Sequence, residues 1–159
     1  YIDRAGKIIA SSTPMDKVSE DASNFKCKFC DHNAVCHSAK APEVNCRTCA
    51  FSTAAIEDGR EVGKWVCERS NLELSESEQR SACSKHLFNP FMLAGWATII
   101  DADAEKVNYE NRHTKEHFTN GSGVDEYSSL ELSTVKDLRL VGDSNVKALK
   151  KAFAAEVVI

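Results

Sequence analysis

Alternating apolar and polar residues predict strands in several parts of the chain. Lys64–Glu68 alternates as a two-faced strand does, and residues 106–112 and 117–121 predict a small hairpin. Residues 4–13 predict a further strand, and the apolar run Phe91–Ile100 predicts either a strand or a docking segment. We therefore expect short strands joined by tight turns.

Helix-capping residues predict a few short helices among these strands. Ser75 followed by Glu78 is a capping box, and Ser128 or Ser129 begins another helical turn. Residues 143–153 carry apolar side chains at helical spacing behind a capping Asp-Ser pair, which predicts a C-terminal helix. Strands and helices together, without an internal repeat, predict the α+β fold class.

The pattern divides the 159 residues into three modules. Residues 1–45 combine the first strand with a cysteine motif, residues 46–90 form a second cysteine-rich module, and residues 91–159 form a small α+β module. Modules of this size bury little apolar surface, so we expect metal ions to stabilise the two that hold cysteines. No apolar run approaches the roughly twenty residues that span a bilayer, which excludes a membrane protein.

All seven cysteines lie in one stretch of the chain. Their spacing is Cys27-x2-Cys30-x5-Cys36-His37, followed by Cys46-x2-Cys49-x17-Cys67-x15-Cys83-x2-His86. Two residues between a pair of ligands allow both to reach one metal ion across a tight turn. The odd number of cysteines and their close pairs argue against a disulfide framework, so the pattern predicts metal binding.

The second module has the residues of a zinc ribbon. Cys46, Cys49, Cys67 and Cys83 supply four thiolates, the closed tetrahedral set that structural zinc prefers. His86 is a fifth candidate, and it could replace Cys67 because it is paired with Cys83. We favour the four sulfurs, since Cys67 lies on the strand face that the hairpin turns toward the first pair. His86 is then expected to hydrogen-bond a thiolate or a backbone group.

The first motif resembles the C-terminal cysteine triplet of RecB-like nucleases of the PD-(D/E)XK superfamily, which carry an iron–sulfur cluster. CRISPR-associated exonucleases and AddB-type helicase–nucleases are examples. In phage-encoded nucleases of this type a second cysteine module follows, and the resemblance extends over residues 4–90 through Cys46-Arg47-Thr48-Cys49, Trp65-x-Cys67, Gln79 and Cys83-x2-His86. It implies a metal-binding region of a phage DNA exonuclease, in the cytoplasm of a bacterial host.

The chain departs from that family at two points. Family members hold Mg²⁺ with an Asp and a [Asp/Glu]-x-Lys pair, but no lysine here has an acidic residue two positions before it. A family cysteine upstream of the triplet also has no counterpart before Cys27. We therefore assign no catalytic residues and expect a region that braces a nuclease core and assists with DNA. Because Tyr1 lies in a strand already under way, we expect a piece of a longer polypeptide.

The metal of the first site depends on its fourth ligand. Cys27, Cys30 and Cys36 supply three thiolates, whereas a [4Fe–4S] cluster takes four, and the resemblance places the fourth upstream. His37 is the nearest local candidate, and three cysteines with one histidine form a sound zinc set. For the chain as given we favour zinc, with the iron–sulfur cluster as the alternative.

Net charge supports a second interpretation of function. A net charge of −4 gives the chain as a whole no excess of positive charge that would attract nucleic acid. Together with the apolar segment Phe91–Ile100, it favours a free-standing zinc-ribbon protein that binds a protein partner, such as a polymerase or a host factor. A metalloenzyme with an open zinc site fits less well, because sulfur ligands are in surplus. The sequence leaves the oligomeric state open.

Overall fold

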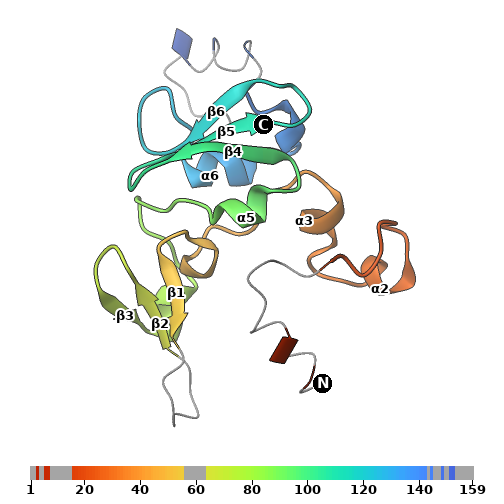
Figure 1. Ribbon diagram of the computed structural model, residues 1–159, viewed down its shortest axis with the longest axis horizontal. Coiled ribbons are helices and arrows are strands. Elements are labelled where there is room, and N and C mark those ends of the chain that lie inside the picture. Colours follow the sequence, from red (N-terminus) through yellow and green to blue (C-terminus); the bar gives the residue numbers. More distant parts are fainter. Residues whose placement is uncertain are drawn as a thin grey trace. The chain divides into compact units, whose positions relative to one another are not determined.

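The computed structural model describes residues 16–55 and 64–142, together with residues 3, 6, 7, 144, 148, 151 and 152. The chain forms two compact units, residues 1–38 and 39–159 (Figure 1). Each unit is described by itself below. Within the described ranges, no helix is both long and apolar enough to cross a membrane.

From residue 16 onward, the described part of the first unit contains the short helices α2 (Phe25–Lys28) and α3 (Asn33–His37). Asn24 caps α2 by accepting a hydrogen bond from the Lys26 backbone N–H at 3.1 Å. The Asn33 side chain donates to the carbonyl of Cys27 at 2.9 Å and so holds the two helices together. The strand predicted for residues 4–13 lies outside the described residues, apart from Gly6 and Lys7.

The second unit begins with a small antiparallel sheet of strand order β1-β2-β3. Ser52 of β1 is opposite Cys67 of β2, and Trp65 of β2 is opposite Leu74 of β3. The capping box predicted at Ser75 is confirmed and starts α4. The elements in chain order are the 3₁₀ helix η1 (Cys46–Thr48), β1 (Ser52–Ala55), β2 (Lys64–Cys67), β3 (Leu72–Leu74) and α4 (Glu76–Gln79).

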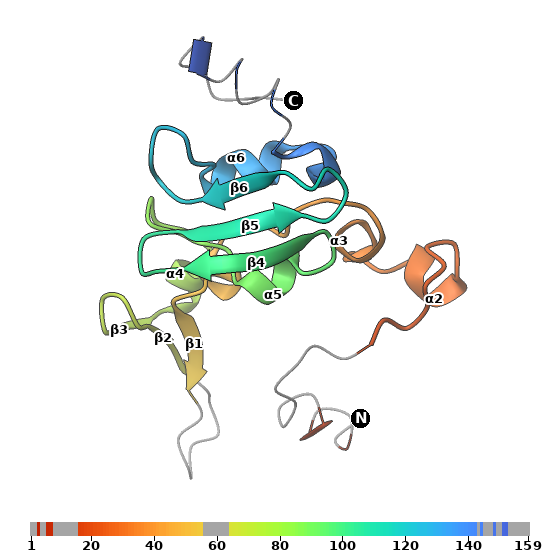
Figure 2. The same cartoon turned by 45° about the horizontal axis from the view of Figure 1, so that its top comes forward.

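A second antiparallel sheet, of order β4-β5-β6, follows in the same unit. The predicted hairpin is confirmed as β5 and β6, and the apolar segment before it supplies a short helix and a third strand. In the pairing of β4 with β5 the register shifts between Ile99 and Asp101. Helix α6 lies beside this sheet in both views (Figures 1 and 2). The elements are α5 (Pro90–Leu93), β4 (Ala97–Ala102), β5 (Val107–Asn111), β6 (His117–Asn120), α6 (Ser129–Thr134) and the 3₁₀ helix η2 (Leu138–Leu140).

One hydrophobic core holds this second sheet to its surroundings. The Phe118 ring lies between those of Trp96 and Tyr109, with ring centroids 5.1 Å apart on both sides and nearly parallel planes. Leu87 and Phe88, which directly follow His86 in the sequence, are buried in the same core. The remaining buried members are Leu93, Ala97, Val107, Tyr127, Leu132, Val135, Leu138 and Val141.

Two antiparallel sheets with short helices make this an α+β protein, as predicted. The C-terminal helix expected from residue 143 onward lies largely outside the described residues, as does the hairpin tip at residues 56–63.

Candidate metal centre

All three pairs spaced by two residues close the same backbone turn. In each, the N–H of the second ligand residue donates to the carbonyl of the first. The donor–acceptor distances are 3.0 Å for Cys30 to Cys27, 3.2 Å for Cys49 to Cys46 and 3.1 Å for His86 to Cys83. The structure therefore forms the tight turns that the spacing predicted.

Main-chain hydrogen bonds join the Cys46–Cys49 pair to the segment that carries Cys83 and His86. The N–H of Cys46 donates to the carbonyl of Ser81 at 2.8 Å, two residues before Cys83. Cys49 forms an isolated antiparallel bridge with Phe88 on the other side of that cysteine. The backbones of the two pairs are thus held next to each other.

Cys67 reaches the same region from the end of β2. It is opposite Ser52, three residues after Cys49. A hydrogen bond from the Ser70 hydroxyl, with further ones from the backbone N–H groups of Ser70 and Arg69, lowers the pKa of the Cys67 thiol. These bonds favour the thiolate, which is the form that binds metals.

The four ribbon thiols lie close enough to act on one another electrostatically. Burial raises the pKa of the Cys46 thiol, and the neighbouring thiols of Cys49, Cys83 and Cys67 and the Glu78 carboxylate raise it further. A divalent cation would relieve this repulsion between negative charges. The other three thiols of the favoured four-sulfur set thus all lie near enough to Cys46 to affect its charge.

The sulfurs are neighbours but are not arranged as a finished site. Among the described residues, no three His, Cys, Asp or Glu side chains are placed to hold a metal ion. This applies equally to the first motif, where Cys27 is buried but Cys30 and Cys36 are exposed. His37 ends helix α3 directly after Cys36. The donor chemistry fits zinc, and a metal would have to draw the thiols together on a backbone whose ligand turns are already in place.

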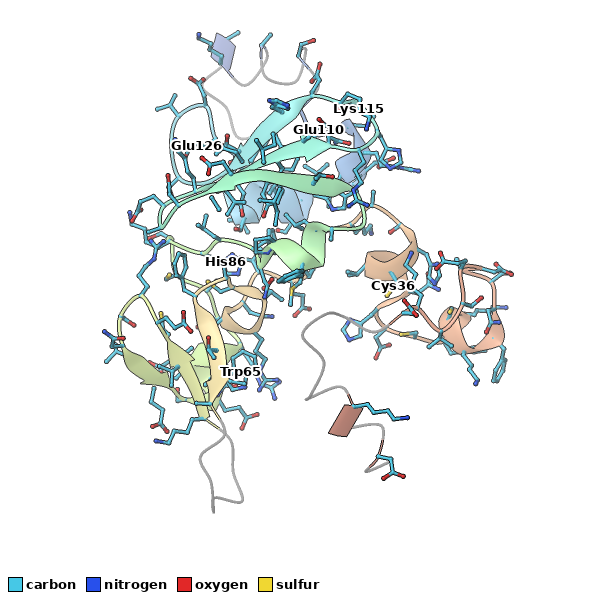
Figure 3. The ribbon with its side chains drawn as sticks, in the orientation of Figure 1. Cys36, Trp65, His86, Glu110, Lys115 and Glu126 are labelled. Carbon is cyan, nitrogen blue, oxygen red and sulfur yellow. The ribbon has the colours of Figure 1, made fainter. Side chains whose placement is uncertain are left out.

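His86 is held in one tautomer by its surroundings. The ring is buried, with only 6% of the residue exposed, and its Nε2 lies 3.0 Å from the carbonyl of Asn45 (Figure 3). A carbonyl only accepts hydrogen bonds, so Nε2 carries the proton. Burial lowers the pKa of His86, which favours the neutral ring. Nδ1 is therefore a bare acceptor, and it is buried with no hydrogen-bond partner among the described residues.

This tautomer decides which roles His86 can take. The predicted hydrogen bond to a backbone group is present, whereas Nδ1 has no proton to donate to a thiolate. A histidine that binds a metal commonly donates its other N–H to a backbone carbonyl. Nδ1 is thus the atom through which His86 would act in the alternative ligand set.

The buried ring also predicts a pH dependence of stability. Because the pKa of His86 is lower in the folded than in the unfolded chain, the unfolded state binds more protons below about pH 6.5. We expect the free energy of unfolding to fall between pH 7.5 and 5.5, and to fall less in His86→Gln. Urea unfolding, with zinc content measured at each pH, checks this. The exposed His113→Gln is the control, and an equal fall in His86→Gln would contradict the assignment.

Two buried polar side chains connect this region to the second sheet. The Ser129 hydroxyl donates to the carbonyl of His86 at 2.9 Å, and the Asn120 side chain accepts from the N–H of Phe88 at 3.0 Å. Asn120 also donates to the carbonyl of Tyr127 at 2.9 Å. The sequence analysis named Ser129 only as a possible helix cap and missed Asn120, although Asn120 stands in phase with buried Phe118 on β6.

Gln79 braces the first pair from helix α4. The Arg47 guanidinium donates to its Oε1 at 2.9 and 3.2 Å, and its Nε2 donates to the carbonyl of Leu74 at 3.0 Å. Gln79 is one of the few buried polar residues of the described chain. It joins the turn between the first two ribbon cysteines to the end of β3.

No protein-family model matches the chain. No curated protein and no solved structure matches it either. The nuclease resemblance therefore stays a prediction from cysteine spacing.

Proposed function

We propose that this chain is a zinc-binding structural region of a RecB-like phage DNA exonuclease, where it braces the nuclease core and assists in handling DNA. The observation that carries the proposal is the proximity of the Cys49, Cys67 and Cys83 thiols to Cys46, which brings together cysteines from three separate places in the chain. Their spacing beside a cysteine triplet is what resembles that family.

The role proposed for the ribbon metal is structural. Four thiolates fill the tetrahedral coordination of zinc and leave no position for water or substrate. Cys67 already receives hydrogen bonds from Ser70 and Arg69, as the thiolates of a rigid metal site do. The hydrolytic residues of the family have no counterpart in this sequence, so hydrolysis is assigned to the core that the region braces.

A second metal is proposed at Cys27, Cys30 and Cys36. Zinc with His37 as fourth ligand is the favoured occupant, and a [4Fe–4S] cluster completed from elsewhere is the alternative. Support comes from the turn closed between Cys27 and Cys30, and from the bond that Asn33 at the start of α3 donates to the Cys27 carbonyl.

Metal analysis and a nuclease assay test the proposal together. We expect the anaerobically purified chain to be colourless, to hold about two zinc ions and to leave linear DNA uncut with Mg²⁺ added. A brown protein with about four irons would show that the first site holds an iron–sulfur cluster instead of zinc. Cleavage that survives removal of contaminating nuclease would contradict the accessory role, and a metal-free folded protein would contradict the ribbon.

Exposed apolar residues favour a second candidate, docking to a protein partner such as a polymerase. Phe91 and Met92 on α5 are 59% and 40% exposed, and Ile99 and Ile100 on β4 are 46% and 50% exposed. Surfaces of this kind commonly mark protein contacts. Co-sedimentation with a host polymerase that Phe91→Asp abolishes would favour this function over DNA handling.

A further inference from the structure

Helix α2 presents two aromatic rings to solvent. Phe25 begins the helix and Phe29 is the capping residue directly after it, and their rings lie together, while Cys27 between them is buried. Phe25 is 78% and Phe29 72% exposed, and no other Phe, Trp or Tyr of the described chain is as exposed. Their rings meet edge to face, with centroids 5.4 Å apart.

A lysine stands on each side of this aromatic pair. Successive residues of a helix are about 100° apart, so Lys26 and Lys28 flank the two rings in opposite directions. The Lys28 ammonium lies 5.9 Å from the centre of the Phe29 ring, which places positive charge next to the aromatic surface. We call Phe25, Lys26, Lys28 and Phe29 the aromatic–lysine face.

The surroundings hold this face in position, and its own two lysines supply its positive charge. Its backbone is fixed by the Asn24 cap and by the bond from Asn33 to the Cys27 carbonyl. Of the acidic residues near it in the sequence, Glu20 pairs with Lys17 at 3.7 Å, Asp21 accepts hydrogen bonds from Ser23, and Asp31 is exposed.

We propose that the aromatic–lysine face binds single-stranded DNA, with bases stacked on Phe25 and Phe29 and phosphates paired with Lys26 and Lys28. Aromatic side chains beside basic ones form the general platform for single strands, whose unpaired bases leave their flat faces free. A protein partner fits less well, because lysine is depleted from interface cores, where its charge would lose water. The proposal deepens the DNA-handling part of the proposed function and rests on it.

Binding of the full chain to a fluorescein-labelled oligo-dT strand, followed by anisotropy, tests the stacking. We expect Phe25→Ala with Phe29→Ala to weaken binding by at least about fivefold for each ring removed, since one base–aromatic stack contributes about 1–3 kcal/mol. Phe91→Ala is the matched control, because Phe91 is also exposed but has no lysine beside it. Wild-type affinity in the double variant would overturn the proposal.

The salt dependence of the same binding tests the lysines. Each phosphate of a single strand that a lysine neutralises adds about 0.7 to the slope of log K against log salt, so we expect Lys26→Gln with Lys28→Gln to lower the slope by about 1.4. Lys17→Gln is the control, because Lys17 is paired with Glu20. An unchanged slope would overturn the proposal even if the phenylalanine variant fails to fold.

The possible results distinguish a failure of the aromatic–lysine face from a failure of the proposed function as a whole. Oligo-dT binding that persists in both double variants keeps DNA handling but moves it elsewhere on the chain. No binding by the wild type overturns the face and DNA handling together, while zinc content reports on the ribbon independently. A protein-docking face would show as self-association in light scattering that the phenylalanine variant removes, with DNA binding unchanged.

Discussion

Replacing Cys46 and Cys49 by serine is expected to release the ribbon metal and to unfold strands β1 to β3. No residue of these three strands is buried, so the first sheet has no hydrophobic core of its own. Structural zinc contributes an apparent binding free energy of about 10–16 kcal/mol in small modules, which far exceeds what such strands could gain by packing. Zinc content and the amide NMR signals of the two sheets measure the loss.

The second sheet provides the internal reference for that experiment. Its core contains Trp96, Tyr109 and Phe118 and none of the ribbon cysteines, so the signals of β4 to β6 should stay dispersed when those of β1 to β3 collapse. Cys30→Ser, a cysteine change in the other unit, should leave both sheets ordered. A double variant that keeps the first sheet without bound zinc would show that the ribbon interpretation is wrong.

Replacing Asn111 by alanine is expected to destabilise the second sheet by about 3–5 kcal/mol, a large part of the total stability of a small domain. Its amide nitrogen donates to the carbonyls of Leu138, Arg139 and Val141 at 3.0, 3.2 and 2.7 Å, and its oxygen accepts from the N–H of His113 at 2.9 Å. Alanine would remove all four bonds and leave the carbonyl of buried Val141 without this donor, while the Leu138 carbonyl would keep only the bond from the Val141 N–H. Urea unfolding followed by tryptophan fluorescence measures the change.

Asn108 on the same strand is the matched control. It is half-buried and accepts one hydrogen bond from the Thr119 hydroxyl at 2.8 Å, so Asn108→Ala should cost only about 1 kcal/mol. Equal losses at the two positions would mean that the carbonyls around Asn111 find other partners.

Local features of this fold were readable from the sequence. The capping box at Ser75 forms as predicted, and Ser128, one of the two predicted starts of the later helix, also forms one, because each serine and the acidic residue three positions later satisfy each other without help from the rest of the chain. The strand at Lys64 and the hairpin of β5 and β6 also follow from alternation alone. Each of these depends on contacts between residues close in sequence.

Features that depend on distant residues were not readable. Leu87 and Phe88 look like the end of the cysteine module, but they pack into the core of the second sheet. Asn111 and Asn120 look like surface residues, although each stands two positions after a buried aromatic residue of its strand. That alternation was the available signal. The tautomer of His86 also needed the structure, since only the carbonyl of Asn45 reveals which ring nitrogen is bare.

The register shift in β4 bears on how this protein avoids aggregation. An outer strand exposes unpaired backbone groups, and Ile99 and Ile100 would make this one an attractive template for a strand from another copy. Because the ladder shifts between Ile99 and Asp101, Ile100 is an extra residue that breaks the regular hydrogen-bond spacing. A second strand could therefore pair with only a short piece of β4. A single inserted residue thus protects this edge from growing into a continuous intermolecular sheet.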